Sequence, residues 1–144
     1  MYIVKEENKI NMNDRDIRRG DIFYIKNDDN AVGFEQKKTR PAIIVSNNAN
    51  NRASGVVEIV YLTTSQKHRP LPTHIRVRGY VPSIALCEQV VTVDVSRLME
   101  RIGCCSYDEM EAVNCGLAVS LGLKSVNSYS YQQVRSEKPW LFAK

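Results

Sequence analysis

Basic residues of this 144-residue chain gather in two segments that adjoin apolar runs. Lys37-Lys38-Thr39-Arg40 comes directly before the run 41–46, and Lys67-His68-Arg69 follows the β-branched run 56–64. Arginine suits a phosphate group because its planar guanidinium donates two parallel hydrogen bonds to it. Taken alone, the pattern favours a solvated basic rim, and the alternative interpretation is a phosphate-binding site at the ends of two strands.

Pairing of the two apolar runs would add hydroxyl groups to this basic site. In an antiparallel pair, the start of one strand lies beside the end of its neighbour. If residues 41–46 pair with residues 57–63, Arg40 comes close to three hydroxyl-bearing side chains. These are Thr63, Thr64 and Ser65. This pairing would set a permanent cation beside hydroxyl groups and a basic loop, a combination suited to holding a phosphate group.

The chain carries none of the short motifs that mark common catalytic or cofactor sites. It has no G-x-x-x-x-G-K-[ST], no G-x-G-x-x-G, no G-x-S-x-G and no H-E-x-x-H, which excludes the corresponding nucleotide, hydrolase and zinc-protease sites. A two-metal nuclease needs several inward-facing carboxylates, whereas acidic pairs such as Asp28-Asp29 lie in turn contexts. We therefore expect neither a metal nor a cofactor.

The four cysteines do not have the spacing of a metal site. They are Cys87, Cys104, Cys105 and Cys115, without a C-x-x-C pair and with only two histidines in the chain. That set argues against zinc. Reduced and mostly buried thiols are expected, as in a cytoplasmic protein.

Composition is that of one ordinary globular domain, with 43% hydrophobic and 25% charged residues. The formal charge of +4 is a modest bias toward anionic partners. No apolar run approaches the roughly 18 residues that span a bilayer, and the first 20 residues contain no apolar core of a signal peptide. The sequence thus predicts a cytoplasmic protein that does not enter a membrane.

Short strands at turn-like intervals occupy the first two-thirds of the chain. They are expected at 21–26, 41–46, 56–64, 73–78 and 83–95, the last broken near Glu88-Gln89. In the fourth strand, Ile75 and Val77 alternate with His74, Arg76 and Arg78, which predicts a half-buried strand with a basic face. This spacing is typical of a small β-barrel or sandwich.

Helical signals appear toward the end of the chain. A short helix is expected over 96–101, and Ser106 with Glu109 forms a capping box that predicts a helix ending at Gly122. Residues 1–15 are predicted to be a mobile arm and residues 124–144 a tail, which leaves one domain over 16–123. Residues 47–55 and 65–71 are predicted to be polar loops.

Five motifs, in this order and spacing, resemble the MazF/PemK family of toxin endoribonucleases. They are Arg19-Gly20-Asp21-Ile22, Glu35-Gln36-Lys37-Lys38-Thr39-Arg40-Pro41, Leu62-Thr63-Thr64, Pro72-Thr73-His74 and CEQVVTVDVSRL at 87–98. The resemblance covers roughly residues 18–123.

The resemblance implies a mainly β fold with a few helices, namely a small SH3-like and CcdB-like β-barrel with a C-terminal helix, paired as a homodimer. It also implies the toxin of a type II toxin–antitoxin system. Such a toxin is a metal-independent endoribonuclease that cuts single-stranded mRNA at short sequences, leaving a 2′,3′-cyclic phosphate and a 5′-OH. Its partner would be an antitoxin whose acidic, partly disordered C-terminal segment covers the RNA groove.

The resemblance also suggests roles for individual residues. Arg40 and Thr63 match the catalytic arginine and threonine, and Glu35 matches an acidic loop residue. Glu35 and His68 are candidates for proton transfer, whereas His74, in mid-strand, is expected to be structural. RNA-binding residues are expected at Gln36, Lys37, Lys38, Ser46, Asn47, Thr64, Ser65, Gln66, Lys67, His68, Arg69, Arg76, Arg78, Glu88 and Gln89. Among these, Ser46 and Asn47 are expected to end their strand beside the site.

Two other functions stay open at this point. One is a CcdB-like inhibitor that binds DNA gyrase without cutting nucleic acid, and the other is a passive RNA-binding β-barrel. The pairing of Arg40 with Thr63 favours cleavage, because a gyrase inhibitor has no chemical need for it. Base recognition is expected from the loops 47–55 and 65–71, whose side chains offer donors and acceptors.

Overall fold

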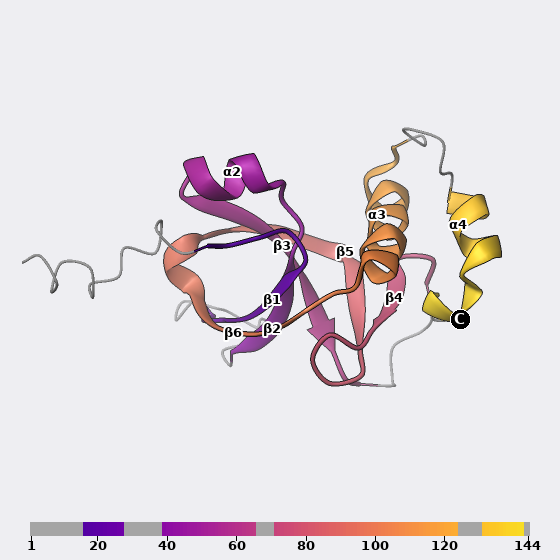
Figure 1. The fold of residues 1–144 in the computed structure, drawn as a ribbon, viewed down its shortest axis with the longest axis horizontal. Coiled ribbons are helices and arrows are strands. Elements are labelled where there is room, and N and C mark those ends of the chain that lie inside the picture. Colours follow the sequence, from indigo (N-terminus) through magenta and orange to yellow (C-terminus); the bar gives the residue numbers. More distant parts are fainter. Residues whose placement is uncertain (1–15, 28–38, 66–70, 124–130, 143–144) are drawn as a thin grey trace, which may run out of the picture.

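The computed structural model describes residues 16–27, 39–65, 71–123 and 131–142, so the arm at 1–15 lies outside the described residues (Figure 1). Its strands are β1 (Asp21–Ile25), β2 (Arg40–Ile44), β3 (Val56–Thr63), β4 (His74–Val77), β5 (Ser83–Asp94) and β6 (Leu98–Cys104). The helices are α2 (Asn48–Ala53), α3 (Tyr107–Leu121) and α4 (Tyr131–Glu137), with short 3₁₀ turns η2 (Val95–Arg97) and η3 (Pro139–Leu141).

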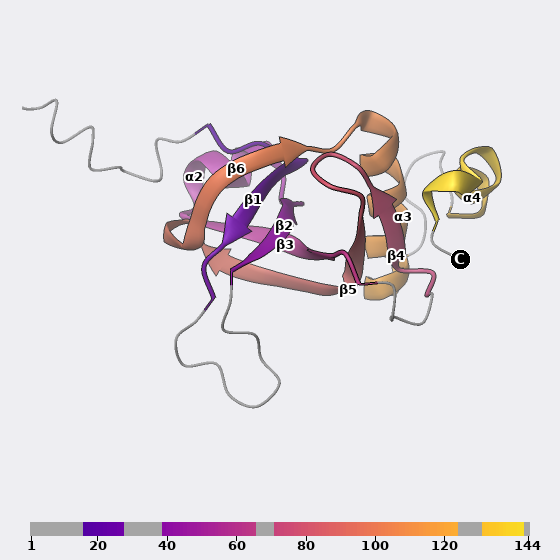
Figure 2. The ribbon, with the colours of Figure 1, turned by 90° about the horizontal axis from the view of Figure 1, so that it is seen from below.

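All six strands form one antiparallel sheet in the order β4-β5-β3-β2-β1-β6. The sheet curls strongly around itself without closing (Figure 2). The turn after β4 reaches the end of β6, where a Cβ on Gly79 would lie only 2.0 Å from the carbonyl oxygen of Cys104. The prediction of a mainly β fold with a few helices is therefore confirmed, as a curled open sheet rather than a closed barrel.

Both faces of the sheet are buried, and strand alternation sends neighbouring residues to different sides. Between the sheet and α3 lies a first core that includes Ile43 and Leu62. A second core fills the inside of the curl and includes Ile25, Ile44 and Ile59. Side chains at the start of β2 and the end of β3 therefore lie either on the side of the first core and α3 or on the side of the second core. We call the end of the curl where β2 begins and β3 ends its mouth.

Helix α3 begins and ends as the sequence predicts. Ser106 accepts from the backbone N–H of Glu109 at 3.1 Å, and the Glu109 carboxylate accepts from the N–H of Ser106 at 2.9 Å. Gly122 ends the helix in the left-handed conformation, with φ of 70°. The helix packs on β4 and β5, where it covers the first core.

Two predictions for local structure are wrong. Residues 48–53 form α2 instead of a loop, because Asn47 caps the helix by accepting from the N–H of Asn50. The helix expected over 96–101 is only the turn η2, after which the chain forms strand β6. Pairing with β1 decides this, since β6 supplies the edge of the sheet beside that strand.

The C-terminal segment folds back onto the domain. Helix α4 lies alongside α3 (Figure 1), and Val134, Leu141 and Phe142 are buried in the first core. Phe142 also makes a backbone bridge to Ile75 on the edge strand β4. Lys138 forms ion pairs with two carboxylates of α3, those of Asp108 and Glu111. This segment thus covers one edge of the sheet.

Candidate functional site

The register of β2 and β3 sets Arg40 opposite Thr63. Ala42 pairs with Tyr61 and Ile44 pairs with Ile59, and the same antiparallel register continued by two residues aligns Arg40 with Thr63. Paired residues share one face of a sheet, and here it is the face of the second core. The predicted pairing of residues 41–46 with 57–63 is confirmed, and it produces the expected juxtaposition at the mouth of the curl.

This row of paired residues continues across two more strands. Thr63 pairs with Ile84 on β5, and Ile84 pairs with the exposed Arg76 on β4. Adjacent strands lie about 4.8 Å apart, so the Arg76 backbone lies about 10 Å from that of Thr63. Guanidinium groups therefore originate on both sides of the Thr63 hydroxyl and on the same face of the sheet.

Arg40 is half-buried, and its guanidinium lies over an aromatic ring. Its Cζ is 4.2 Å from the centroid of the Tyr61 ring, a cation–π contact. Burial lowers the pKa of Arg40 from its ordinary value, and the electrostatic effect of Tyr61 opposes the shift. Arginine stays protonated in proteins, so the site carries a permanent positive charge.

Thr63 and Thr64 differ in their surroundings. Thr63 is half-buried, and its Oγ1 accepts a hydrogen bond of 3.1 Å from the backbone N–H of Ser65. A hydroxyl can accept and donate at once, so the Thr63 proton remains available to another acceptor. Thr64 is exposed and lies just beyond the end of β3.

Glu88 holds the start of β4 against a bend in β5. Its Oε1 accepts from the Thr73 hydroxyl at 2.7 Å, and its Oε2 lies 2.9 Å from Nε2 of His74. The register between β3 and β5 shifts beside this position, so the predicted break near Glu88-Gln89 is a bend within one strand. Burial raises the pKa of Glu88, but the hydrogen bonds from Thr73 and His74 outweigh it, and the pKa lies below its ordinary value.

His74 does not belong to an exposed basic face. It is 3% exposed, whereas Arg76 and Arg78 are exposed. Its contact with the Glu88 carboxylate explains why a polar residue can be buried there. The exposed basic face of this strand is therefore limited to the arginines, and the burial of His74 agrees with the expectation that it is structural.

Ser46 and Asn47 are not near Arg40, contrary to the prediction. They follow the other end of β2, and six residues of extended chain separate Ser46 from Arg40 by about 20 Å. Ser46 is buried, where its hydroxyl donates to Oδ1 of Asn51 and accepts from the N–H of Glu58. Both residues stabilise α2 and its junction with β3, so the expected recognition loop at 47–55 lies away from the site.

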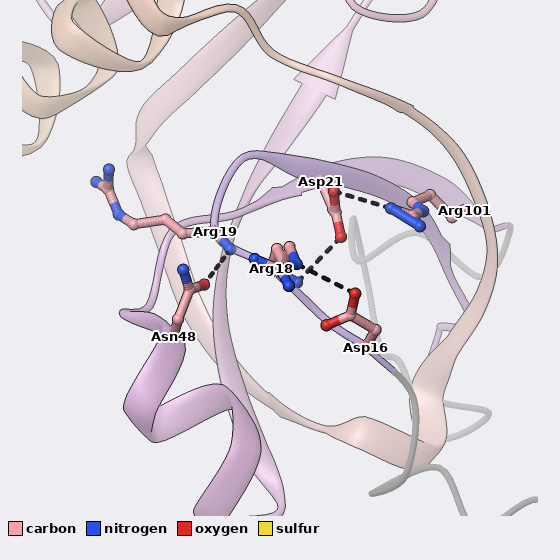
Figure 3. Close-up of polar contacts among 6 residues, drawn as sticks. All are labelled: Asp16, Arg18, Arg19, Asp21, Asn48 and Arg101. Carbon is pink, nitrogen blue, oxygen red and sulfur yellow. Dashed lines mark hydrogen bonds and ion pairs between the residues drawn. The ribbon is translucent and has the colours of Figure 1, made fainter.

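The motif Arg19-Gly20-Asp21-Ile22 also belongs to that far end (Figure 3). The backbone N–H of Arg19 donates to Oδ1 of Asn48 at 2.7 Å. Asp21 is buried, and its carboxylate accepts from the N–H of Arg18 and from Arg101 at 3.3 Å. These contacts fasten the start of β1 to α2 and β6, so we interpret the motif as structural.

Several predicted site residues lie outside the described residues. They are Glu35, Gln36, Lys37, Lys38, Gln66, Lys67, His68 and Arg69. The two segments that carry them join the described chain at Thr39 and Ser65, next to Arg40 and Thr63. Of the remaining candidates, Gln89 is half-buried in β5, and the backbone N–H of Arg78 donates to the Glu109 carboxylate at 2.7 Å.

The described part of the chain contains no group of three or more His, Cys, Asp or Glu side chains that could hold a metal ion. All four cysteines are free thiols: Cys87 and Cys115 are buried, and Cys104 is exposed. Burial raises the pKa of Cys87 and of Cys105 to about 12. Within the described ranges, no helix has the length and apolar character to cross a membrane.

Within the part of the site that the structure describes, Tyr61 is a residue that sequence reasoning does not single out. It stands in an apolar β-branched run, where a tyrosine is ordinary strand composition. Its position two residues before Thr63 places it on the same strand face, and this alternation is the only signal for it in the sequence.

Comparisons with known proteins agree with this geometry. The sequence profile described as "PemK-like, MazF-like toxin of type II toxin-antitoxin system" matches residues 18–121. The protein named endoribonuclease MazF of Staphylococcus saprophyticus is 31% identical over 118 residues, covering 78% of this chain and 98% of the relative.

Solved structures give the same result. The structure titled as an endoribonuclease in complex with its cognate antitoxin, from mycobacterial species, has a TM-score of 0.61 and 25% identity, with 78% of this chain and 99% of that chain covered. MazF from Deinococcus radiodurans shares the fold, with a TM-score of 0.65 and 24% identity over 76% of this chain and all of the other. The resemblance in the motifs is thus confirmed, and because the profile spans well over half of the sequence, this chain belongs to the family of PemK-like, MazF-like toxins of type II toxin–antitoxin systems.

Proposed function

We propose that this toxin is a metal-independent endoribonuclease that cleaves single-stranded RNA, mRNA in the cell, at short specific sequences. The observation that carries the proposal is the register of β2 and β3, which, continued by two residues beyond the pair Ala42 and Tyr61, aligns Arg40 with Thr63. The relative from Staphylococcus saprophyticus, which bears the name endoribonuclease, supports it.

RNA supplies its own nucleophile, so the chemistry requires neither a metal nor an activated water. The 2′-oxygen forms a bond to phosphorus while the bond from phosphorus to the 5′-oxygen breaks. A base takes the 2′-hydroxyl proton, and an acid protonates the departing 5′-oxygen. The products are a 2′,3′-cyclic phosphate and a 5′-OH.

While the 2′-oxygen attacks and the 5′-oxygen departs, phosphorus passes through a five-coordinate phosphorane. Arg40 and Thr63 are proposed to stabilise this species. The Arg40 guanidinium stabilises its two negative charges, and the Thr63 hydroxyl donates to a non-bridging oxygen. Proton transfer is assigned to Glu35 and His68, which belong to the segments that adjoin Arg40 and follow Ser65. Inhibition of growth follows from loss of mRNA.

Basic residues around this centre would hold the phosphate backbone. Arg76 shares the row of Thr63, and Arg78 follows on the same strand edge. Lys37, Lys38, Lys67 and Arg69 would extend the same surface from the two adjoining segments. Base recognition is assigned to residues 65–71, because α2 occupies the other candidate loop at the far end of β2.

Two protein partners are proposed. An antitoxin segment rich in carboxylates and apolar anchors would compete for this basic surface, in line with the mycobacterial relative solved with its cognate antitoxin. A second copy of the chain would pair through apolar surface of the sheet and α3, where Leu121 and Val119 are exposed.

The test is cleavage of a long mixed-sequence RNA in EDTA by the wild type, Arg40→Ala and Arg52→Ala. Arg52 is the control, because it is an exposed arginine of α2 at the other end of β2. Loss of Arg40 should lower the single-turnover rate by about 10²–10³-fold, whereas Arg52→Ala should cleave like the wild type.

Sequencing of the new 5′ ends should show 5′-OH groups at one short motif. Intact RNA together with stalled DNA gyrase would support the CcdB-like alternative. Stoichiometric RNA binding without turnover would indicate a passive RNA-binding barrel. Cleavage by folded Arg40→Ala at the wild-type rate would refute the site.

A further inference from the structure

We propose that Tyr61 is a positioning residue that holds the Arg40 guanidinium in its phosphate-binding orientation. This inference rests on the proposed endoribonuclease function. It concerns how the arginine is placed, not the chemical step itself, because the ring contacts Arg40 and not the reacting atoms.

The sheet places the ring diagonally across from Arg40. Tyr61 pairs with Ala42, so Arg40 is two residues further along the neighbouring strand and on the same face. Long side chains reach one another across such a diagonal. The small Ala42 side chain leaves the space above β2 to the ring, and the guanidinium carbon lies 4.2 Å from the ring centroid.

The ring itself is anchored. Tyr61 is half-buried and packs against the second core, whose nearby members include Ile59 and Ile44. A ring fixed by core packing has few alternative rotamers, so it offers a rigid platform in the absence of RNA. Among the described residues, the contact that the structure gives for the Arg40 guanidinium is the one with the Tyr61 ring.

Stacking leaves the phosphate-binding edge of arginine free. The Arg40 Cζ lies over the Tyr61 ring at 4.2 Å, and the five N–H donors of a guanidinium diverge in its plane, so donors directed away from the ring stay available to a phosphate. A free arginine side chain would lose rotamer freedom when RNA binds. A guanidinium held beforehand loses less, so the ring should strengthen both RNA binding and stabilisation of the transition state.

Two substitutions separate the contribution of the Tyr61 ring to cleavage from the contribution of its hydroxyl. Tyr61→Phe keeps the stacking surface, and we expect single-turnover cleavage within about twofold of the wild type. Tyr61→Leu keeps apolar bulk but removes the ring, and we expect a loss of about 3- to 10-fold. Tyr24→Leu is the control: Tyr24 is a half-buried strand tyrosine of β1 whose ring and hydroxyl contact Tyr80 instead of Arg40.

A double-mutant cycle tests whether the effect acts through Arg40. The readout is affinity for an RNA with a 2′-deoxy residue at the cut site, so no cleavage occurs. Tyr61→Leu should weaken binding in the wild-type background and have no further effect in Arg40→Ala. An equal loss in both backgrounds would show a general structural role and overturn the proposal.

An NMR signal reports the geometry directly in the folded full chain. The Arg40 Nε–Hε resonance should be shifted upfield by the ring current in the wild type and in Tyr61→Phe, and should move downfield in Tyr61→Leu. An unchanged resonance in Tyr61→Leu would overturn the inference. If Arg40→Ala cleaves normally, the proposed function itself fails. If Arg40 is required and Tyr61→Leu behaves as the wild type, only the inference fails.

Discussion

Consecutive threonines at the end of β3 occupy different environments, and this difference predicts different roles. Thr63 is half-buried in the row that contains Arg76 and faces Arg40, whereas Thr64 is exposed beyond the strand. Only Thr63 stands in the strand register that aligns with Arg40, so we expect its hydroxyl, and not that of Thr64, to reach a phosphate beside Arg40.

Thr63→Val should therefore reduce single-turnover RNA cleavage by at least about tenfold, because the donor to the phosphorane is lost. Thr64→Val should change it by less than about twofold. Thr63→Ser restores a hydroxyl that can donate to the phosphorane and accept from the N–H of Ser65, so it should recover most of the activity and assign the loss in Thr63→Val to the hydroxyl. Equal effects at both positions would mean that the strand register does not select the site.

Glu88 links stability to pH. Hydrogen bonds from Thr73 and His74 hold its pKa below the ordinary value, against the effect of burial. A carboxyl with a lowered pKa in the folded state stabilises the fold above the pKa of the unfolded chain, roughly 4.3. That contribution is lost as the pH falls through the folded-state pKa.

Glu88→Gln should accordingly lower the free energy of unfolding at pH 7 by no more than about 0.5 to 1 kcal/mol, because solvent screens this partly exposed carboxylate. The difference from the wild type should shrink below about pH 4. Urea denaturation at pH 7 and below pH 4 measures the difference in free energy of unfolding. Glu58→Gln is the control, because Glu58 is an exposed residue of β3. A difference that is independent of pH would show that the Glu88 carboxylate charge does not carry the effect.

At the scale of elements, the C-terminal segment is part of the folded core. The family match ends at residue 121, yet Val134, Leu141 and Phe142 fill the side of the first core next to α3 and β4. The bridge from Phe142 to Ile75 also pairs part of an edge strand, which blunts its tendency to pair with other chains.

Two aromatic residues of this segment, one buried and one exposed, allow a matched test of its contribution to stability. Phe142 is 6% exposed and Trp140 is 61% exposed. Phe142→Ala should lower the free energy of unfolding by about 3 kcal/mol because it leaves a cavity in the core, and Trp140→Ala by less than about 0.5 kcal/mol. Chemical denaturation measures both, and equal small effects would show that the segment contributes little to stability.

At the scale of the whole molecule, charge position matters more than net charge. The formal charge is only +4, but Arg40 and Arg76 lie in one row of the sheet. Phosphate contacts release counterions, so the affinity for single-stranded RNA should fall with salt at a slope of about −0.7 per contact.

Arg76→Gln should flatten that slope by about 0.7, uniformly across RNA sequences. Arg52→Gln removes the same charge from α2, away from the row, and should leave the slope unchanged. Affinity is measured over a series of salt concentrations with the uncleavable RNA. Identical slopes for Arg76→Gln and the wild type would place the RNA on another surface.

Local patterns in the sequence determined much of this protein. The apolar and β-branched runs predicted β1, β2 and β3, and the Ser106 capping box with Gly122 bounded α3. These signals depend on residues only a few positions apart. Pairing two such runs was enough to bring Arg40 and Thr63 together, because an antiparallel register follows from where the strands begin and end.

Tertiary structure decided what depends on distant residues. Leu98–Cys104 became β6 because β1 offered an edge to pair with, and His74 became buried because the bend of β5 brought Glu88 to it. The contact of Tyr61 with Arg40 depends on strand register and on the small Ala42 between them. Such contacts are set by the three-dimensional packing of separate segments, which short-range sequence patterns do not encode.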